Sequence, residues 1–157
     1  MPLWIDTAAA GIAAACYGVF FSIPLQMLAW PALLGATAHA VRWCAIATFG
    51  VGPALGAGIA CLVVGTLMAP IAQRHHLPFA AVGFASVVSL MPGIFIFRMS
   101  SALVQLQAQA GPAMPALAAD ALSDVVTTLL IVAAMTFGLA VPKHLFNHFA
   151  RPKPRAR

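Results

Sequence analysis

Charged residues are scarce in this sequence. Only 7% of its 157 residues are Asp, Glu, Lys or Arg, whereas 62% are hydrophobic. The acids are three aspartates, Asp6, Asp120 and Asp124. A soluble domain usually carries roughly 25% charged residues, so this chain has too little polar surface to cover a globule in water. We therefore expect an integral membrane protein.

The patterns of enzymes and of metal or cofactor sites are also missing. Cys16, Cys44 and Cys61 stand in separate apolar stretches without ligand spacing, and His75-His76 alone makes a poor metal site. The sequence has no nucleophile–base set, phosphate loop or dinucleotide fingerprint. We expect no enzymatic activity and no cofactor. The net charge of +5 does not indicate nucleic-acid binding, because most Lys and Arg residues lie at the C-terminus, where anionic lipids account for them.

Long apolar runs predict a polytopic bundle of membrane-spanning helices. A spanning helix needs about 20 apolar residues, and the segments that meet or approach this length are 7–23, 51–72, 77–97 and 125–142. The runs are continuous rather than alternating, which argues against a β-barrel. The first segment lacks the basic start of a secretory signal and is preceded by Asp6, so we interpret it as a permanent helix. The expected fold is all-α, with four to five spans.

The segment 31–50 is ambiguous because it carries His39 and Arg42 in its middle. It could be a short span, a re-entrant segment or a helix at the membrane interface. We favour a short or interfacial helix over a full span. His39 and Arg42 share a face, and they could either anchor the segment at the interface, with Trp30 and Trp43 beside them, or lie at the mouth of an anion pathway.

The distribution of Lys and Arg predicts the orientation, because cytoplasmic connections are enriched in these residues. The C-terminal segment and the connection around Arg74 are basic, whereas 104–119 contains neither Lys nor Arg. We therefore expect the C-terminal segment and the connection around Arg74 in the cytoplasm, and 104–119 outside. The N-terminus would be inside with four spans and outside with five. Residues 1–146 would form a single transmembrane domain, and 147–157 a basic cytoplasmic tail.

The pair Pro92-Gly93 interrupts the apolar segment 77–97. Proline removes a backbone donor and glycine adds flexibility, so we expect a broken helix at this point. In transporters, the half-helix after such a break presents N–H groups and a positive dipole end to an anion. The alternative is a kink that only shapes helix packing.

A polar stripe follows the break. Arg98, Ser101, Gln105 and Gln109 fall on one helical face. Asp120, Asp124 and Thr127 share one face of the last span. An arginine in the membrane interior costs about 2.5–3.5 kcal/mol on the insertion scale, so it normally has a partner or a function. Asp124 could pair with Arg98 or carry a proton, and Asp120 suits a first-turn position. Alternatively, Arg98 reaches the headgroups at the outer interface.

Small residues at four-residue spacing recur in the segment 51–72. Glycines at such positions let membrane helices approach closely. We expect helix packing at Gly52, Gly56, Gly58 and Gly65.

The order of these features resembles the threonine/serine exporter family, and its small-subunit type most closely. The stretches that carry the resemblance are FSIPLQMLAWPALLGATAHAVRW, GIACLVVGTLMAPIAQR and SLMPGIF, followed by a last span with a basic tail. The small-subunit type matches the C-terminal membrane half of the longer members. The resemblance implies a bacterial inner-membrane exporter of small carboxylate-bearing metabolites, either threonine and serine or dicarboxylates such as succinate. It also implies a larger membrane subunit of the same family as partner.

We therefore expect one half of a secondary exporter, completed by the larger subunit or by a second copy of the chain. The residues expected along the substrate pathway are Pro92, Gly93, Arg98, Ser101, Asp124, His39 and Arg42. The alternatives are a structural or assembly subunit that holds no substrate, and a small channel-forming homo-oligomer.

Overall fold

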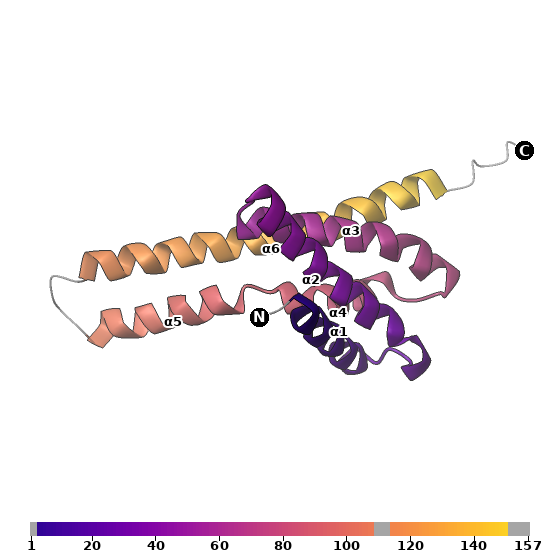
Figure 1. Cartoon of the computed structure of the whole chain (residues 1–157), viewed down its shortest axis with the longest axis horizontal. Helices are drawn as coiled ribbons and strands as arrows, with labels where there is room; N and C mark the ends of the chain where they lie inside the picture. The colour runs from indigo at the N-terminus through magenta and orange to yellow at the C-terminus, as the bar shows by residue number, and fades with distance from the viewer. Residues whose placement is uncertain (1–2, 109–113, 151–157) are drawn as a thin grey trace, which may run out of the picture.

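The computed structural model describes residues 3–108 and 114–150, and this part of the chain is helical without any β-strand. The helices, labelled in Figure 1, are α1 (Leu3–Phe20), α2 (Ala29–Phe49), α3 (Pro53–Arg74), α4 (Phe79–Val87), α5 (Gly93–Ala108) and α6 (Met114–Ala150). Two short 3₁₀ turns, η1 (Leu25–Met27) and η2 (Val88–Leu90), precede α2 and follow α4. The predicted all-α bundle is confirmed.

Four stretches of the described residues are long and apolar enough to cross a membrane: α1, 25–49, α3 and most of α6. A fifth crossing results if α4 with η2 and α5 count as one span, bent by 60°. The prediction of four to five spans with one of them broken is confirmed. The expected short helix within 31–50 is wrong in length, because α2 has 21 residues and packs along both α1 and α3.

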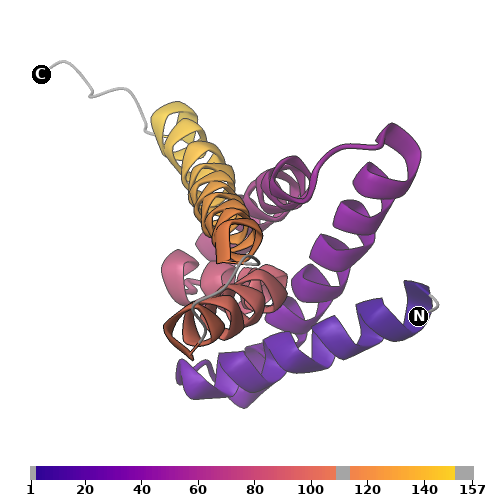
Figure 2. The ribbon, with the colours of Figure 1, turned by 90° about the vertical axis from the view of Figure 1, so that its left-hand side faces the viewer.

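The core forms where α3 packs against α6, and α3 lies between α6 and α2 (Figure 2). Small side chains on both helices make this packing close. A Cβ added to Gly58 would lie 3.2 Å from the Ala134 Cβ, and one added to Gly65 would lie 3.1 Å from the Gly138 carbonyl oxygen. Gly138 is tighter still, because its added Cβ would lie 2.7 Å from the Cys61 Cβ. The sequence pattern identified the α3 glycines but not Gly138.

Gly52 and Gly56 differ in whether they contact a neighbouring helix. Gly56 faces α2, where its added Cβ would lie 3.0 Å from Ile46 Cγ1. Gly52 precedes the helix as its N-cap, and no atom of the described chain lies within 4 Å of its added Cβ. The expected packing contact is therefore absent at Gly52, because that residue lies outside the helix–helix interface.

Two ring contacts place helices beside each other at the end of the bundle that contains the α3–α4 connection. The rings of Trp30 and His75 lie 5.2 Å apart, which places the start of α2 beside the end of α3. The Lys143 ammonium lies 5.4 Å from the centre of the Phe79 ring, which places α6 beside the start of α4. Gln73 of α3, Phe79 and Lys143 line a common cavity, so Arg74 and Lys143 lie at the same end of the bundle.

At the opposite end, α5 and the N-terminal part of α6 run side by side away from the other helices (Figure 1). We call this pair of helices the α5–α6 arm. α6 has 37 residues, so it is about 55 Å long at 1.5 Å per residue, whereas the hydrocarbon core of a bilayer is about 30 Å thick. The predicted domain boundary at 146/147 falls inside α6, and 151–157 lie outside the described residues.

Candidate functional site

The break in the fourth apolar segment lies between Leu90 and Gly93, as the Pro92-Gly93 pair predicts. Pro92 has no N–H to continue the helix, and the chain instead tightens into η2 before turning into α5. The Met91 N–H donates to the Val88 carbonyl at 3.1 Å, which closes the first half. The break therefore has its own local hydrogen bonds, and it redirects the chain by 60°.

The N–H groups after the break are largely engaged. The Gly93 N–H donates to the Met91 carbonyl at 2.8 Å, and those of Phe95 and Ile96 donate to the Pro92 carbonyl, each at 3.1 Å. The expectation that this half-helix offers several free N–H groups to an anion is therefore not met in this conformation. The physical reason is the tight turn around Pro92, whose carbonyl accepts two bonds. The side chains of α5 consequently matter more than its backbone.

The first half of the broken helix is enclosed by α1 and α2. Gly35 of α2 permits this, because its added Cβ would lie 3.2 Å from the Ser86 carbonyl oxygen and 2.5 Å from the Ala14 Cβ. Leu90, at the end of this half, is fully buried. α4 and η2 are thus held by two neighbouring helices, whereas α5 packs mainly on α6.

Arg98 and Asp124 form an ion pair inside the α5–α6 arm. The Arg98 Nε lies 3.3 Å from Asp124 Oδ2. The Asp124 side chain is only 9% exposed, whereas that of Arg98 is 59% exposed. The aspartate is therefore enclosed by the arm, while more than half of the Arg98 side chain remains accessible to a further partner. The structure therefore contains the predicted Arg98–Asp124 pair.

Both members of this pair line a cavity of about 240 Å³. Its lining includes the predicted stripe residues Ser101 and Gln105, which are joined by a hydrogen bond of 3.2 Å from the Gln105 amide to the Ser101 hydroxyl. Asp120 also lines it, so the cavity contains one guanidinium and two carboxylates. Such a set can hold a carboxylate at Arg98 and an ammonium group at the aspartates. Gln109, the last predicted stripe residue, lies outside the described residues.

His39 and Arg42 do not line this cavity. The His39 Nδ1 lies 3.0 Å from Asp6 Oδ2, and its Nε2 lies 3.2 Å from the Ser89 carbonyl oxygen. Arg42 is near enough to Asp6 for electrostatic attraction. A second polar cluster therefore joins α1 and α2 to the end of the first half-helix. We call Asp6, His39 and Ser89 the break cluster.

Sequence reasoning missed the role of Asp6. The signal was present, since Asp6 begins an apolar segment and a second apolar segment contains a histidine. The contact with the Ser89 carbonyl could not be predicted, because it depends on how α2 crosses the broken helix.

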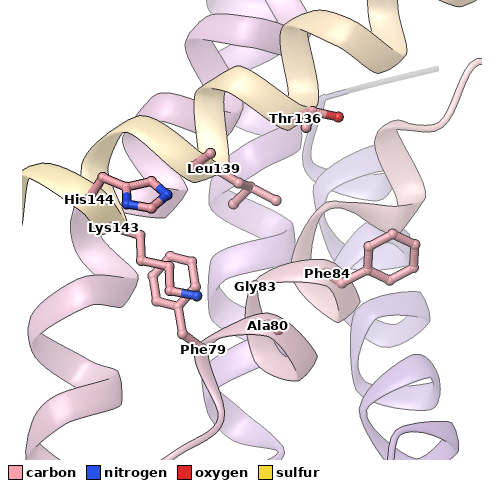
Figure 3. Close-up of a pocket in the computed structure, with 9 residues that line it drawn as sticks. Phe79, Ala80, Gly83, Phe84, Thr136, Leu139, Lys143 and His144 are labelled. Atoms are coloured by element: carbon pink, nitrogen blue, oxygen red, sulfur yellow. The ribbon is translucent and has the colours of Figure 1, made fainter. Parts of the chain in front are cut away.

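A larger cavity of about 290 Å³ lies between α4 and α6 at the basic end (Figure 3). Its lining is mostly apolar, and Lys143 lies against the Phe79 ring with His144 beside it (Figure 3). The cavity brings no carboxylate near its one lysine. We take the Arg98 cavity as the candidate site because charged groups of both signs converge there.

A comparison with known protein families gives one match that spans most of the chain. The model of a family described as "Threonine/Serine exporter, ThrE" matches residues 6–145. The match includes both halves of the broken helix, the ion pair and the break cluster. No solved structure matches the chain.

Proposed function

The chain belongs to the threonine/serine exporter family, and we propose that it forms one half of a secondary exporter of small carboxylate-bearing metabolites. The proposal depends above all on one observation, the ion pair between Arg98 of the half-helix that follows the break and Asp124 of α6. Threonine, serine and dicarboxylates such as succinate all carry a carboxylate that a guanidinium can bind.

The chemistry of Arg98 supports this role. A guanidinium has five N–H donors in a planar fork and binds carboxylates in a bidentate manner. The contact with Asp124 involves its Nε, and the side chain is 59% exposed. Arg98 therefore retains donors for a substrate while Asp124 keeps it oriented. The bend at Pro92-Gly93 supports the role indirectly, because it sets the direction in which α5 carries Arg98 and Ser101.

We propose a bacterial inner-membrane location with five crossings and a cytoplasmic C-terminus. The basic residues Arg74 and Lys143 share one end of the bundle and would face the cytoplasm. With an odd number of crossings, the N-terminus and the turn of the α5–α6 arm would be outside. Asp6, Arg98 and Asp124 would then lie in the outer half of the membrane.

A partner is required in this proposal because the chain alone encloses its cavity poorly. The α5–α6 arm projects from the bundle (Figure 1), and Phe97, which lines the cavity, is 75% exposed. Secondary transporters commonly set two repeats around a central site. The larger membrane subunit of the same family is the proposed partner, and a second copy of this chain is the alternative.

The assembly-subunit alternative receives less support. It requires glycine faces that remain free to dock another protein. Gly56, Gly58 and Gly65 instead contact α2 and α6 of the same chain. Substitution of Gly56 would therefore disturb this chain itself, and it cannot distinguish assembly from transport.

The proposed function is tested by efflux from cells that lack their own exporters. Cells are preloaded with labelled threonine, serine or succinate and express this chain alone, the larger subunit alone, or both. We expect efflux of one substrate class when both subunits are present, and its loss with Arg98→Gln after efflux is normalised to the amount of the chain in the membrane. The matched control is Gln107→Ala, which removes an exposed polar side chain elsewhere on α5. Efflux that is unchanged by Arg98→Gln would contradict the proposed role of the pair.

A further inference from the structure

The break cluster supports an inference of its own, which does not depend on the Arg98–Asp124 pair in the α5–α6 arm. We propose that Asp6 and His39 form a one-proton site, and that this site controls how α2 holds the broken helix through Ser89. The inference rests on the proposed exporter function and adds the residues that would couple transport to protons. It follows from the hydrogen-bond geometry, which limits where protons can be.

The two contacts of the His39 ring require two protons. The Ser89 carbonyl oxygen only accepts hydrogen bonds, so its contact with Nε2 at 3.2 Å needs a hydrogen on Nε2. The contact of Nδ1 with Asp6 Oδ2 at 3.0 Å needs a second hydrogen between those atoms. Imidazolium with carboxylate meets this requirement, and so does neutral imidazole with carboxylic acid. In both cases the pair has no net charge.

Removal of one proton breaks one of the two contacts. If the hydrogen between Asp6 and Nδ1 leaves, a carboxylate oxygen faces the lone pair of Nδ1. If instead the ring keeps its hydrogen on Nδ1, the lone pair of Nε2 faces the Ser89 carbonyl. The arrangement in the structure is therefore the proton-bound state of the pair.

Ser89 supplies a partner for the other state. Its hydroxyl oxygen is buried and has no hydrogen-bond partner in the described part of the chain. A buried hydroxyl without a partner is costly and uncommon. After proton loss, the Ser89 hydroxyl can donate to the Nε2 lone pair while Nδ1–H donates to the Asp6 carboxylate. In this second state, His39 would be hydrogen-bonded to the side chain of Ser89 instead of to its backbone carbonyl.

The surroundings suit a group that exchanges a proton. Asp6 is 45% exposed near the start of α1, whereas His39 is only 15% exposed. Arg42 from α2 is the nearby cation, and Cys61 of α3 lies close to Arg42. The stretch 79–90 contributes no ionisable side chain. The proton would pass between solvent and the pair at Asp6, which in the proposed orientation is on the outer side.

The position of Ser89 connects the pair to the substrate pathway. Ser89 lies within η2, just before the residues at which the chain bends by 60° into α5. Whether α2 holds the Ser89 carbonyl therefore affects the half-helix that carries Arg98. Histidine and carboxylate groups serve as proton relays in membrane pumps and transporters.

The test uses Asp6→Asn in vesicles that contain the full chain with its larger subunit. The asparagine amide can donate to Nδ1 as a carboxylic acid does, but it cannot release a proton. We expect Asp6→Asn to keep the exchange of labelled for unlabelled threonine or succinate and to lose net transport driven by a pH gradient. Gradient-driven transport equal to that of the wild type would overturn the inference. Absence of both exchange and net transport in the wild type would instead contradict the proposed function.

Ser89→Ala and Ser86→Ala form a matched pair of variants. The Ser86 hydroxyl donates within its own helix to the Val82 carbonyl at 2.7 Å, so its loss leaves the break cluster intact. We expect Ser89→Ala to slow gradient-driven transport, and Ser86→Ala to leave it unchanged. Equal rates in the two variants would contradict the role of the Ser89 hydroxyl.

A spectroscopic measurement tests the site independently of transport. The chain is labelled with ¹⁵N-histidine, and the His39 signal is identified by its loss in His39→Gln. We expect hydrogens at both ring nitrogens of His39, as described above, at low pH. As the pH rises, the Asp6–His39 pair should lose one proton in a single step, and Asp6→Asn should change this step. The His144 signal should be the same in both proteins. A His39 titration that is identical with and without Asp6 would overturn the one-proton site.

Discussion

Replacement of Gly138 by leucine is expected to separate α3 from α6 and to prevent the chain from accumulating in the membrane. A Cβ at Gly138 would lie 2.7 Å from the Cys61 Cβ and 2.8 Å from the Gly58 carbonyl oxygen. The Gly58 backbone cannot move without shifting α3. Membrane helices associate mainly through close packing, since lipid is as apolar as their side chains. Overpacking of a close interface costs about 1–3 kcal/mol or more, and here it acts on the largest interface of the chain.

The measurement is the thermal stability of the purified chain in detergent, together with its level in membranes. Gly52→Leu is the matched control, because it adds the same side chain where no described atom lies within 4 Å of the new Cβ. Its backbone, with φ −65° and ψ 162°, is accessible to leucine. We expect the control to match the wild type. A Gly138→Leu chain of wild-type stability would show that α3 and α6 do not pack as described.

The second large effect is expected at the Arg98–Asp124 pair, with an asymmetry between its members. Arg98→Gln leaves Asp124, which is 9% exposed, without its cation. On the insertion scale, an unpaired carboxylate costs about 2.5–3.5 kcal/mol at the bilayer centre, which is the upper limit for Asp124 in the outer half of the membrane. Asp124→Asn leaves a cation that is 59% exposed and has a long stem, so it can reach a more polar region. We therefore expect Arg98→Gln to lower the protein level more than Asp124→Asn does.

The double variant Arg98→Gln/Asp124→Asn separates stability from transport. It removes both charges, so its protein level should recover toward that of the wild type, as a cycle of single and double variants would quantify. We expect efflux to remain absent despite this recovery. Efflux restored together with protein level would mean that the pair serves only to join α5 to α6, and that the substrate carboxylate binds elsewhere.

The fold was largely predictable because the apolar runs and the Pro92-Gly93 pair act locally. The pairing of Arg98 with Asp124 was predictable for a related reason, since few charges exist in this chain and each needs a partner in the membrane. The length of α2 was mispredicted because His39 and Arg42 were counted as obstacles to a long apolar helix. In the structure His39 contacts Asp6 and Ser89, and Arg42 lies near Asp6, which reduces the cost of placing them in a bundle.

Other features depend on three-dimensional contacts that no local pattern contains. Ala134 and Gly138 do stand four positions apart in the last span, but this spacing alone does not show which residues of another helix they contact. The importance of Gly138 arises from the crossing point with Cys61 of α3. The pairing of N–H groups at the break depends on the turn that Pro92 adopts. Asp6 was used only as evidence against a signal peptide, although its carboxylate contacts a helix that lies 33 positions further along the chain.

The close contact at Gly138 also provides a point about which the polar end of α6 can tilt. Gly138 lies 14 positions after Asp124, so a straight helix separates the two residues by about 21 Å. If α6 tilted by about 10° around its contact with α3, that length would carry Asp124 sideways by about 4 Å. This displacement exceeds the 3.3 Å that now separates Asp124 from Arg98. A slight change of crossing angle deep in the bundle would thus suffice to open the ion pair at the far end of the helix, with no unfolding of either helix.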